Sequence, residues 1–306
     1  MRTLAIDLGG SRAKMAIVTD GVYQGLAIVP VDSLGSMRET LECLAQEALR
    51  LMGKEPGPID GVGLSFPGIV RDGRIVESNG KYADASQIDP EEWSQKYFHT
   101  GIKLINDAAA ALEGELRFGV GQGADSAVMM ILGTGVGTAA AADGRVLVGK
   151  HGTLGILGGH IAVETTRKRR CTCGNMSCLE AWAGTWALKG LAQEEPDFAD
   201  SVLAKAEEIN YRTLYEGALA GDPLCVRLFD STVEKLCVGA VNLIHAYDPE
   251  VLILSGGASH IPQIGQRIQE YIQTYAWTPW GTVEVRRAEN PEASVLLGLH
   301  AIWLHS

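Results

Sequence analysis

A unit consisting of an apolar strand, a glycine-rich turn and a returning strand occurs twice in this chain of 306 residues. The first copy spans residues 3–18 and turns at Gly9-Gly10-Ser11, and the second spans residues 127–142 and turns at residues 133–138. Glycine is needed where the backbone turns tightly or must approach a ligand closely. The recurrence predicts a duplicated fold with two α/β halves.

The rest of the chain alternates between helical and strand patterns. Ser36-Met37-Arg38-Glu39 is a capping-box sequence and predicts a helix start. Apolar runs predict strands and periodic apolar positions predict helices. We expect strands at 61–66, 103–105 and 251–254. We expect helices at 108–116, in several segments between 179 and 247, and at 291–304. We expect an N-terminal α/β domain of residues 1–116 plus 291–306 and a C-terminal α/β domain of residues 117–290 with a structural zinc site.

The composition is that of a globular protein, with 46% apolar and 21% charged residues. A net charge of −11 argues against a nucleic-acid partner, which normally requires a basic face. Asp7 interrupts the first apolar run before a signal peptide could form, and no apolar stretch approaches the roughly 20 residues that span a bilayer. We therefore expect a cytoplasmic protein without a membrane partner.

Three glycine-rich loops follow apolar strands, and loops of this kind can present backbone N–H groups to a phosphate. None of them fits the P-loop pattern or the Rossmann fingerprint. Turn glycines alone would explain one such loop, but three together favour nucleotide binding, with Asp7 placed to hold Mg²⁺ through water. The expected nucleotide contacts are Gly9, Gly10, Ser11, Arg12, Gly133, Thr134, Gly135, Val136, Gly137, Gly256 and Gly257.

Cys171, Cys173 and Cys178 lie within eight positions of one another, shortly after His160. Three thiolates and one imidazole form a complete tetrahedral zinc set that leaves no position for a catalytic water. Core thiols or a disulfide are the alternatives, but the clustering and the lack of a secretion signal favour structural zinc. The remaining cysteines are expected to be inert core residues: Cys43, Cys225 and Cys237.

Asn106 and Asp107 stand where a predicted strand ends and a predicted helix begins. Aspartate is a common helix N-cap, and spacing alone favours that role for Asp107. The other role is that of a catalytic base, which in kinases accepts the proton of the attacking hydroxyl. The residues alone leave both roles open.

Together these motifs resemble the ROK family of sugar kinases and sugar-responsive repressors, over essentially the whole chain. Residues 7–12 are similar to the family's D-x-G-G-T-K, residues 63–68 to G-x-x-x-P-G, residues 106–115 to N-D-A-N-A-A-A-x-G-E, and residues 133–137 to G-T-G-V-G. The most specific match is the zinc signature, formed by Gly159, His160, Cys171, Cys173, Gly174, Cys178 and Glu180.

The resemblance implies an actin-like ATPase (ribonuclease H-like) fold of two α/β domains with an interdomain cleft for ATP, Mg²⁺ and a sugar. It implies that Asp107 deprotonates the sugar hydroxyl that attacks the γ-phosphate, and that His160 and the three cysteines bind structural Zn²⁺. Family members are commonly dimers or tetramers, so a homo-oligomer is expected. The sugar contacts that it implies are Gly68, Asn79, Asn106, Asp107, His160 and Glu180.

One position departs from the family pattern. In the family's G-E-x-G-H, a glutamate stands three residues before the zinc histidine, and this chain has Leu157 there. We expect a buried leucine, which cannot accept hydrogen bonds from sugar hydroxyls, so a glucose-like specificity does not follow from the resemblance.

The resemblance favours an ATP-dependent hexose or hexosamine kinase. One alternative is a sugar-binding protein with weak or no catalysis, since Leu157 replaces a sugar contact. The other is a sugar-responsive transcriptional regulator, which is disfavoured because the first strand begins at Thr3 and leaves no room for an N-terminal DNA-binding segment.

Overall fold

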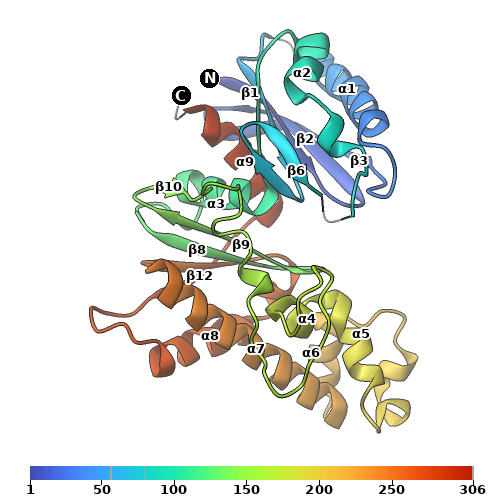
Figure 1. The fold of residues 1–306 in the computed structure, drawn as a ribbon, viewed down its shortest axis with the longest axis vertical. Helices are drawn as coiled ribbons and strands as arrows, with labels where there is room; N and C mark the ends of the chain where they lie inside the picture. Colours follow the sequence, from blue (N-terminus) through green and yellow to red (C-terminus); the bar gives the residue numbers. More distant parts are fainter. Residues whose placement is uncertain (56, 79, 305–306) are drawn as a thin grey trace. The chain divides into compact units, whose positions relative to one another are not determined.

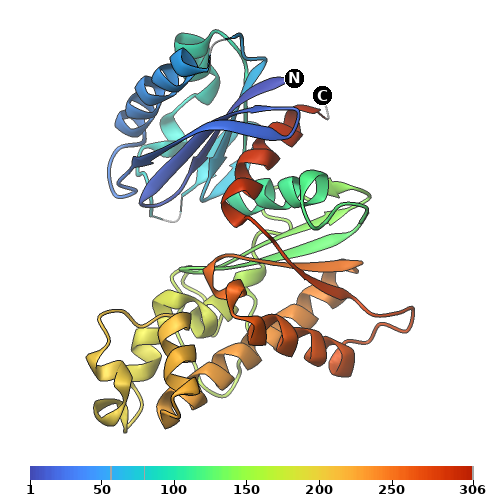
Figure 2. The same ribbon diagram turned by 180° about the vertical axis from the view of Figure 1, so that it is seen from behind.

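The chain forms two compact α/β units in the computed structural model, which describes residues 1–55, 57–78 and 80–304 (Figures 1 and 2). The first unit comprises Met1–Gly123, Arg145–Leu154 and Ala288–Ser306, and the second comprises Ala124–Gly144 and Gly155–Arg287. The sequence placed residues 145–154 in the C-terminal domain. They belong to the first unit instead, where Gly152 packs directly against the backbone of Val70.

The first unit contains a five-stranded sheet in the order β3-β2-β1-β4-β7. Its strands are β1 (Arg2–Leu8), β2 (Arg12–Thr19), β3 (Val22–Pro30), β4 (Gly61–Phe66) and β7 (Ile102–Asn106). β1 runs antiparallel to β2 and parallel to β4, and β4 runs parallel to β7. The carboxyl ends of β1, β4 and β7 therefore share one edge, with Asp7 opposite Ser65 and Phe66 opposite Asn106.

Helices cover both faces of this sheet, as Figures 1 and 2 show. Side chains alternate between the faces of a strand, and Leu4, Ile6 and Leu8 pack in one cluster with the buried side of α1 (Met37–Lys54) and α2 (Pro90–Phe98). Ala5 points the other way, into a cluster with α3 (Asp107–Phe118) and α9 (Pro291–Leu304). A small hairpin completes the unit, formed by β5 (Ile69–Arg71) and β6 (Arg74–Glu77).

The predicted helix start at Ser36 is confirmed, although its capping differs from a full capping box. The Ser36 hydroxyl accepts a hydrogen bond from Glu39 N, and the carboxylate of Asp84 accepts from Met37 N and Arg38 N. Cys43 was expected in the core but is exposed, because the buried face of α1 carries other residues: Met37, Leu41, Leu44, Ala45, Ala48 and Leu51.

α3 and α9 cross at very short range because small residues lie at the contact. A methyl group at Gly298 would overlap the carbonyl of Ala110, and one at Gly114 would overlap the carbonyl of Ser294. Only glycine allows backbones to approach this closely. The crossing fixes α3, and with it the position of Asp107 at its first turn.

The second unit repeats the strand pattern of the first. Its strands belong to a five-stranded sheet in the order β10-β9-β8-β11-β12. Within the run β9-β8-β11-β12, β8 is antiparallel to β9 and parallel to β11, and β11 is parallel to β12. The same succession occurs in β2-β1-β4-β7, which agrees with the expected duplication. The strands are β8 (Ala127–Leu132), β9 (Val136–Ala142), β11 (Val251–Ser255) and β12 (Glu284–Arg287), and β10 (Arg145–Val146) follows β9 along the chain.

Five α-helices of the second unit lie within the described residues: α4 (Leu179–Ala183), α5 (Thr185–Gln193), α6 (Tyr211–Leu219), α7 (Pro223–Tyr247) and α8 (Pro262–Tyr275). α7 has an apolar face on which Val233, Leu236, Ala240 and Ile244 are buried, while Val241 is partly exposed. In the part of the chain that the structure describes, no helix is both long and apolar enough to cross a membrane.

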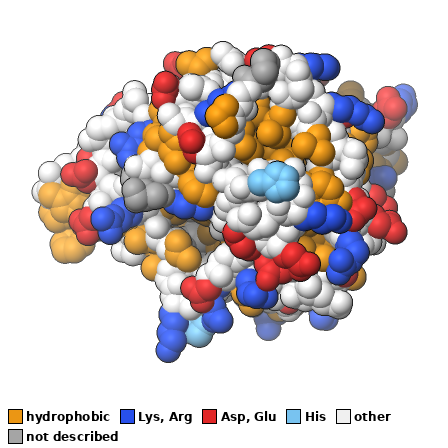
Figure 3. All heavy atoms as spheres, turned by 90° about the horizontal axis from the view of Figure 1, so that it is seen from above, with side chains coloured by type: hydrophobic (Ala, Val, Ile, Leu, Met, Phe, Trp, Pro, Cys, Tyr) orange, Lys and Arg blue, Asp and Glu red, His pale blue; other side chains and the backbone are white. Residues whose placement is uncertain are grey.

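The surface seen in Figure 3 mixes basic, acidic and apolar side chains. Lysine and arginine side chains on this face are scattered among aspartate, glutamate and apolar side chains. A nucleic-acid-binding face normally gathers basic side chains into a patch or stripe, and this face does not show that pattern.

Candidate active site and metal centre

The carboxyl end of β1 carries Asp7, one of the predicted nucleotide-site residues. Ser65 Oγ donates a hydrogen bond of 2.7 Å to Asp7 Oδ1, and Leu8 N donates to Ser65 Oγ at 3.2 Å. Burial raises the pKa of Asp7, while the Ser65 hydrogen bond and the charges of Lys14 and Arg12 oppose that rise. The sequence did not single out Ser65, although its strand lies next to β1 in register.

Asn106, and not Asp107, is the N-cap of α3. Asn106 Oδ1 accepts hydrogen bonds from Ala108 N at 2.9 Å and Ala109 N at 3.1 Å, and Asp107 is the first helical residue. The capping role that spacing favoured for Asp107 is thus filled by the residue before it. Asn106 Nδ2 also donates to Gly68 O at 3.0 Å, which joins two of the predicted sugar contacts.

Asp107 has the electrostatics of a proton acceptor. Burial first, and then the charge of Asp7, raise its pKa to about 6, while a hydrogen bond from Ala108 N and the charge of Lys81 act in the opposite direction. A carboxyl with this pKa is ionised at neutral pH and is more basic than an ordinary aspartate. A buried carboxyl whose pKa is raised further by a nearby carboxylate is typical of a functional site.

The loop after β1 is held by its own backbone and by a buried tyrosine. Gly9 N donates to Arg12 O at 3.1 Å, and the hydroxyl of Tyr82 donates to Gly9 O at 2.9 Å. Arg12, predicted to reach a phosphate, has its guanidinium 3.0 Å from the carboxylate of Glu292, which is also 3.2 Å from Lys14 Nζ. Glu292 therefore pairs with both cations in this structure.

The loop of residues 133–137 is anchored to the start of α5. Thr185 N donates to Gly133 O at 3.2 Å and Trp186 N donates to Thr134 O at 3.1 Å. Gly256 follows the adjacent strand β11 with a φ of 81°, and it packs against the backbone of Leu132 at the end of β8. Two of the three predicted nucleotide loops thus lie side by side at one sheet edge.

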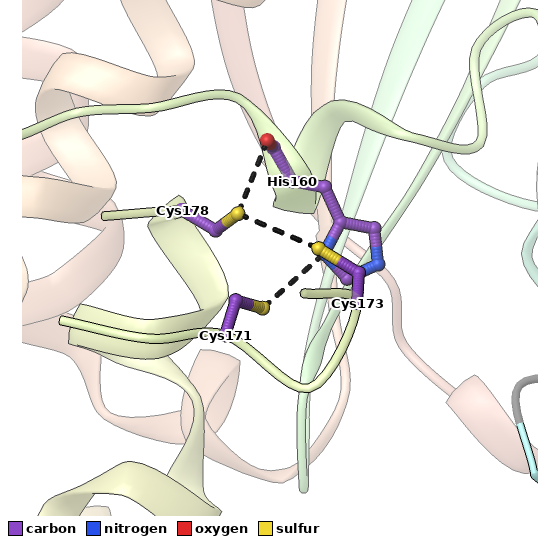
Figure 4. Close-up of side chains that lie close together, drawn as sticks. All are labelled: His160, Cys171, Cys173 and Cys178. Atoms are coloured by element: carbon purple, nitrogen blue, oxygen red, sulfur yellow. Dashed lines mark hydrogen bonds between the residues drawn. The ribbon is translucent and has the colours of Figure 1, made fainter. Parts of the chain in front are cut away.

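The four predicted zinc ligands come together in the second unit (Figure 4). Their ligand atoms all lie within 4.8 Å of one another, with His160 Nδ1 3.6 Å from Cys171 Sγ and Cys173 Sγ 3.7 Å from Cys178 Sγ. Zinc–sulfur bonds of about 2.3 Å and zinc–nitrogen bonds of about 2.05 Å in a tetrahedron separate S and S by about 3.8 Å and S and N by about 3.6 Å. The donor set and its spacing therefore fit zinc.

Local packing explains how His160 is presented. It ends the 3₁₀ helix η2 (Gly158–His160), in which Gly158 N donates to the buried Thr138 Oγ1 at 2.8 Å and Gly159 packs against the backbone of Val136. Leu157 precedes this turn and is 43% exposed, so the expectation of a buried leucine is wrong. The two glycines take the inward positions and leave the Leu157 side chain outside.

Glu180, another predicted sugar contact, already has protein partners for both carboxylate oxygens. Oε2 accepts from Val136 N at 3.1 Å, and Oε1 accepts from Thr172 Oγ1 at 3.2 Å and Trp186 Nε1 at 3.4 Å. Thr172 and Trp186 were not predicted as functional. The last predicted sugar contact, Asn79, lies outside the described residues.

Two α/β units that repeat one strand order, with glycine loops and a carboxylate pair at the strand ends, define an actin-like ATPase fold. Among solved structures, a glucokinase from Streptomyces griseus in complex with glucose and AMPPNP matches with a TM-score of 0.81 at 24% identity, covering 99% of each chain. The family model of the ROK family matches residues 3–306, and the chain belongs to that family.

Curated relatives of this chain include sugar kinases and xylose repressors. It is 28% identical over 313 residues to a glucokinase from Thermotoga maritima, covering 99% of this chain and 97% of the relative. It is 26% identical over 271 residues to the N-acetylgalactosamine kinase AgaK from a Shewanella species, covering 85% and 82%.

Proposed function

We propose that this protein is an ATP-dependent kinase that phosphorylates a hydroxyl of a hexose or hexosamine, with Asp107 as the general base. The observation that carries the proposal is the state of Asp107, a carboxyl at the first turn of α3 whose pKa is raised to about 6. The sugar kinases among the relatives support this class of reaction.

The proposed reaction needs one proton acceptor. The sugar oxygen forms a bond to the γ-phosphorus as the bond to the bridging oxygen breaks and ADP leaves, and the hydroxyl proton passes to Asp107. General-base catalysis is most effective when the pKa of the base lies near the working pH. The elevated pKa of Asp107 meets this condition better than an ordinary aspartate would.

We propose that the nucleotide phosphates lie against the loops of residues 9–12, 133–137 and 256–257. Mg²⁺ held through water by Asp7 would neutralise phosphate charge, which is the chemistry this ion supplies in kinases. The Asp7 carboxylate is oriented for this role by its hydrogen bond from Ser65. Arg12 would leave Glu292 to meet a phosphate.

We propose that His160, Cys171, Cys173 and Cys178 hold a structural zinc ion. A full set of four protein ligands leaves no open position for substrate, so the ion would order the loop and would not enter the reaction. The proposed sugar contacts are those that the family resemblance implies: Gly68, Asn79, Asn106, Asp107, His160 and Glu180.

A sugar-binding protein with weak catalysis is the second candidate, and the observation that favours it is Leu157. An exposed leucine offers no acceptor for a sugar hydroxyl at a position where the family resemblance implies a glutamate. The raised pKa of Asp107 favours the kinase. A transcriptional regulator is less favoured, because the net charge is −11 and the face in Figure 3 carries mixed charges.

The decisive experiment measures ATP consumption over a panel of hexoses, N-acetylated hexosamines and ketoses, with zinc-loaded wild type, Asp107→Asn and the exposed control Asp200→Asn. We expect one sugar class to be turned over, a loss of about 10²–10⁴-fold in Asp107→Asn, and no loss in the control. Wild-type turnover by Asp107→Asn would refute the base. No ATP consumption with any sugar would favour the weakly catalytic alternative.

A further inference from the structure

Glu180 stands where three segments of the second unit meet. Its Oε2 accepts a hydrogen bond from the backbone N–H of Val136, at the end of the loop of residues 133–137. Its Oε1 accepts from the hydroxyl of Thr172 and from the indole N–H of Trp186, near the start of α5. One carboxylate thus touches the glycine loop, the cysteine loop and α5.

The link to the cysteine loop is direct. Thr172 lies between two of the four clustered residues, Cys171 and Cys173, and Cys171 Sγ is itself 4.0 Å from Glu180 Oε1. When a cation gathers the thiolates, the backbone between them becomes fixed, because ligand binding supplies folding energy to such loops. Ordering this loop therefore fixes the hydroxyl that donates to Glu180.

The link to the glycine loop is equally close. Gly135 packs so tightly on the Glu180 carboxylate that a methyl group at Gly135 would occupy the carboxylate's place. The same loop is bonded through the Gly133 and Thr134 carbonyls to α5, which carries the Trp186 indole. A shift of the Glu180 carboxylate would therefore displace the loop of residues 133–137 directly at Gly135 and Val136, and indirectly through Trp186.

We propose that Glu180 is a positioning residue that couples the cysteine loop to the loop of residues 133–137, so that filling the metal site raises the affinity for a nucleoside triphosphate. The proposal rests on the proposed function, which places phosphates at this loop. A carboxylate can accept about four hydrogen bonds, so this role is compatible with a sugar contact as well. Linkage requires the effect to be reciprocal, so the nucleotide tightens metal binding by the same factor.

The test measures binding of AMPPNP by calorimetry, without sugar, to zinc-loaded and chelator-treated protein. Glu180→Gln removes the charge at constant shape, Thr172→Val removes only the hydroxyl, and Thr165→Val is the control in an exposed part of the same unit. A hydrogen bond to a charged group changes affinity by about tenfold. We expect about tenfold weaker binding in zinc-loaded Glu180→Gln and in chelator-treated wild type, and no change in Thr165→Val.

Thr172→Val separates positioning from general stability. With zinc bound it should keep its thermal midpoint while its AMPPNP affinity falls several-fold, and chelation should then weaken AMPPNP binding by less than about twofold. In wild type, AMPPNP should slow zinc transfer to a chromophoric chelator, and in Glu180→Gln it should not. If chelation unfolds the protein, the comparison of the three zinc-loaded variants decides alone.

Equal AMPPNP affinity in zinc-loaded wild type, Glu180→Gln and Thr172→Val would overturn the coupling, and so would tighter binding by either variant. An undiminished chelation effect in a folded Thr172→Val would overturn it too. If zinc-loaded wild type does not bind AMPPNP at all, the proposed function fails and the inference fails with it. If AMPPNP binds but its affinity does not depend on Glu180, the coupling inference is wrong while the proposed function stands.

Discussion

Replacing Gly298 by alanine should destabilise the first unit, although the same change in most helices is stabilising. Glycine in a helix interior costs about 1 kcal/mol relative to alanine. At Gly298 the new methyl group would overlap the carbonyl of Ala110 in α3, which is backbone and cannot rotate away. α3 and α9 must therefore separate by roughly an ångström or more to restore van der Waals contact.

Separation of these helices loosens contacts around the buried side chains of Ala110, Leu296 and Leu299. Overpacking of a tight core costs about 1–3 kcal/mol, and loss of neighbouring contacts adds to it. After subtraction of the helix-propensity gain, we expect a net loss of about 2 kcal/mol in the free energy of unfolding. Because α3 begins at Asp107, we also expect kcat to fall.

Gly53→Ala is the matched control. Gly53 lies near the end of α1 in the same unit, is exposed, and has no heavy atom within 4 Å of an added methyl group. We expect this variant to gain about 0.5–1 kcal/mol. Urea unfolding of wild type and both variants, followed by circular dichroism, measures the difference. Equal midpoints for Gly298→Ala and Gly53→Ala would refute the close-packing argument.

Three further predictions follow from charged and buried groups of the first unit. The pKa of Asp107 of about 6 predicts that kcat falls about tenfold for each pH unit below 6. Because the charge of Asp7 raises this pKa, Asp7→Asn should move the acidic limb of the pH–kcat profile to lower pH, and an unmoved acidic limb would contradict the pairing of the two carboxyl groups. Burial lowers the pKa of His300, whose Nε2 has no hydrogen-bond partner in the described part of the chain. Below the ordinary histidine pKa, the unfolded chain therefore binds a proton at His300 more readily than the folded chain does. The contribution of His300 to the free energy of unfolding should be fully present above pH about 6.5 and should decrease by up to about 1.4 kcal/mol per pH unit below it. Urea midpoints at several pH values measure this dependence, and His300→Gln should make it weaker. Glu292→Gln should free Arg12 and lower the KM for ATP by up to about fivefold, since an exposed ion pair contributes about 0–1 kcal/mol; an unchanged or raised KM would argue against a phosphate role for Arg12.

The sequence predicted best those elements whose signal is local. β1, β8 and β11 are apolar runs that end at glycine, and each was expected within two residues of its observed bounds. β3 was not expected, because an edge strand with mostly exposed side chains shows no regular alternation, and Gly25 and Pro30 interrupt it. The parallel register of β1 with β4 has no local signal at all.

In the candidate site, too, the features with a local sequence signal were predicted and those that depend on distant residues were not. The cysteine cluster was readable because three of its four members lie in one short segment, and the structure brings all four together. The hydrogen bond between Ser65 and Asp7 joins residues on different strands, and only the sheet reveals it. The N-cap of α3 was assigned one residue too late because Asn106 and Asp107 can both cap, and β7 continues through Asn106.

The repeated sheet also accounts for the chemical difference between the two units. Both present a glycine turn after their first strand. In the first unit Asp107 follows β7, and in the second unit Ser255-Gly256-Gly257 lies at the end of β11, the counterpart of β4. The proposed base therefore comes from one copy of the repeat, and two of the uncharged phosphate loops come from the other.

The metal loop lies between β9 and α4, outside the repeated strands, and its ligand atoms are held by local turns. Gly158 and Gly159 anchor η2 on Thr138 and Val136, whereas the Leu157 side chain is 43% exposed. The side chain at residue 157 can therefore change while His160 and the cysteines stay in place. If the proposed sugar site includes this turn, a substitution such as Leu157 would alter specificity without disturbing the metal ligands.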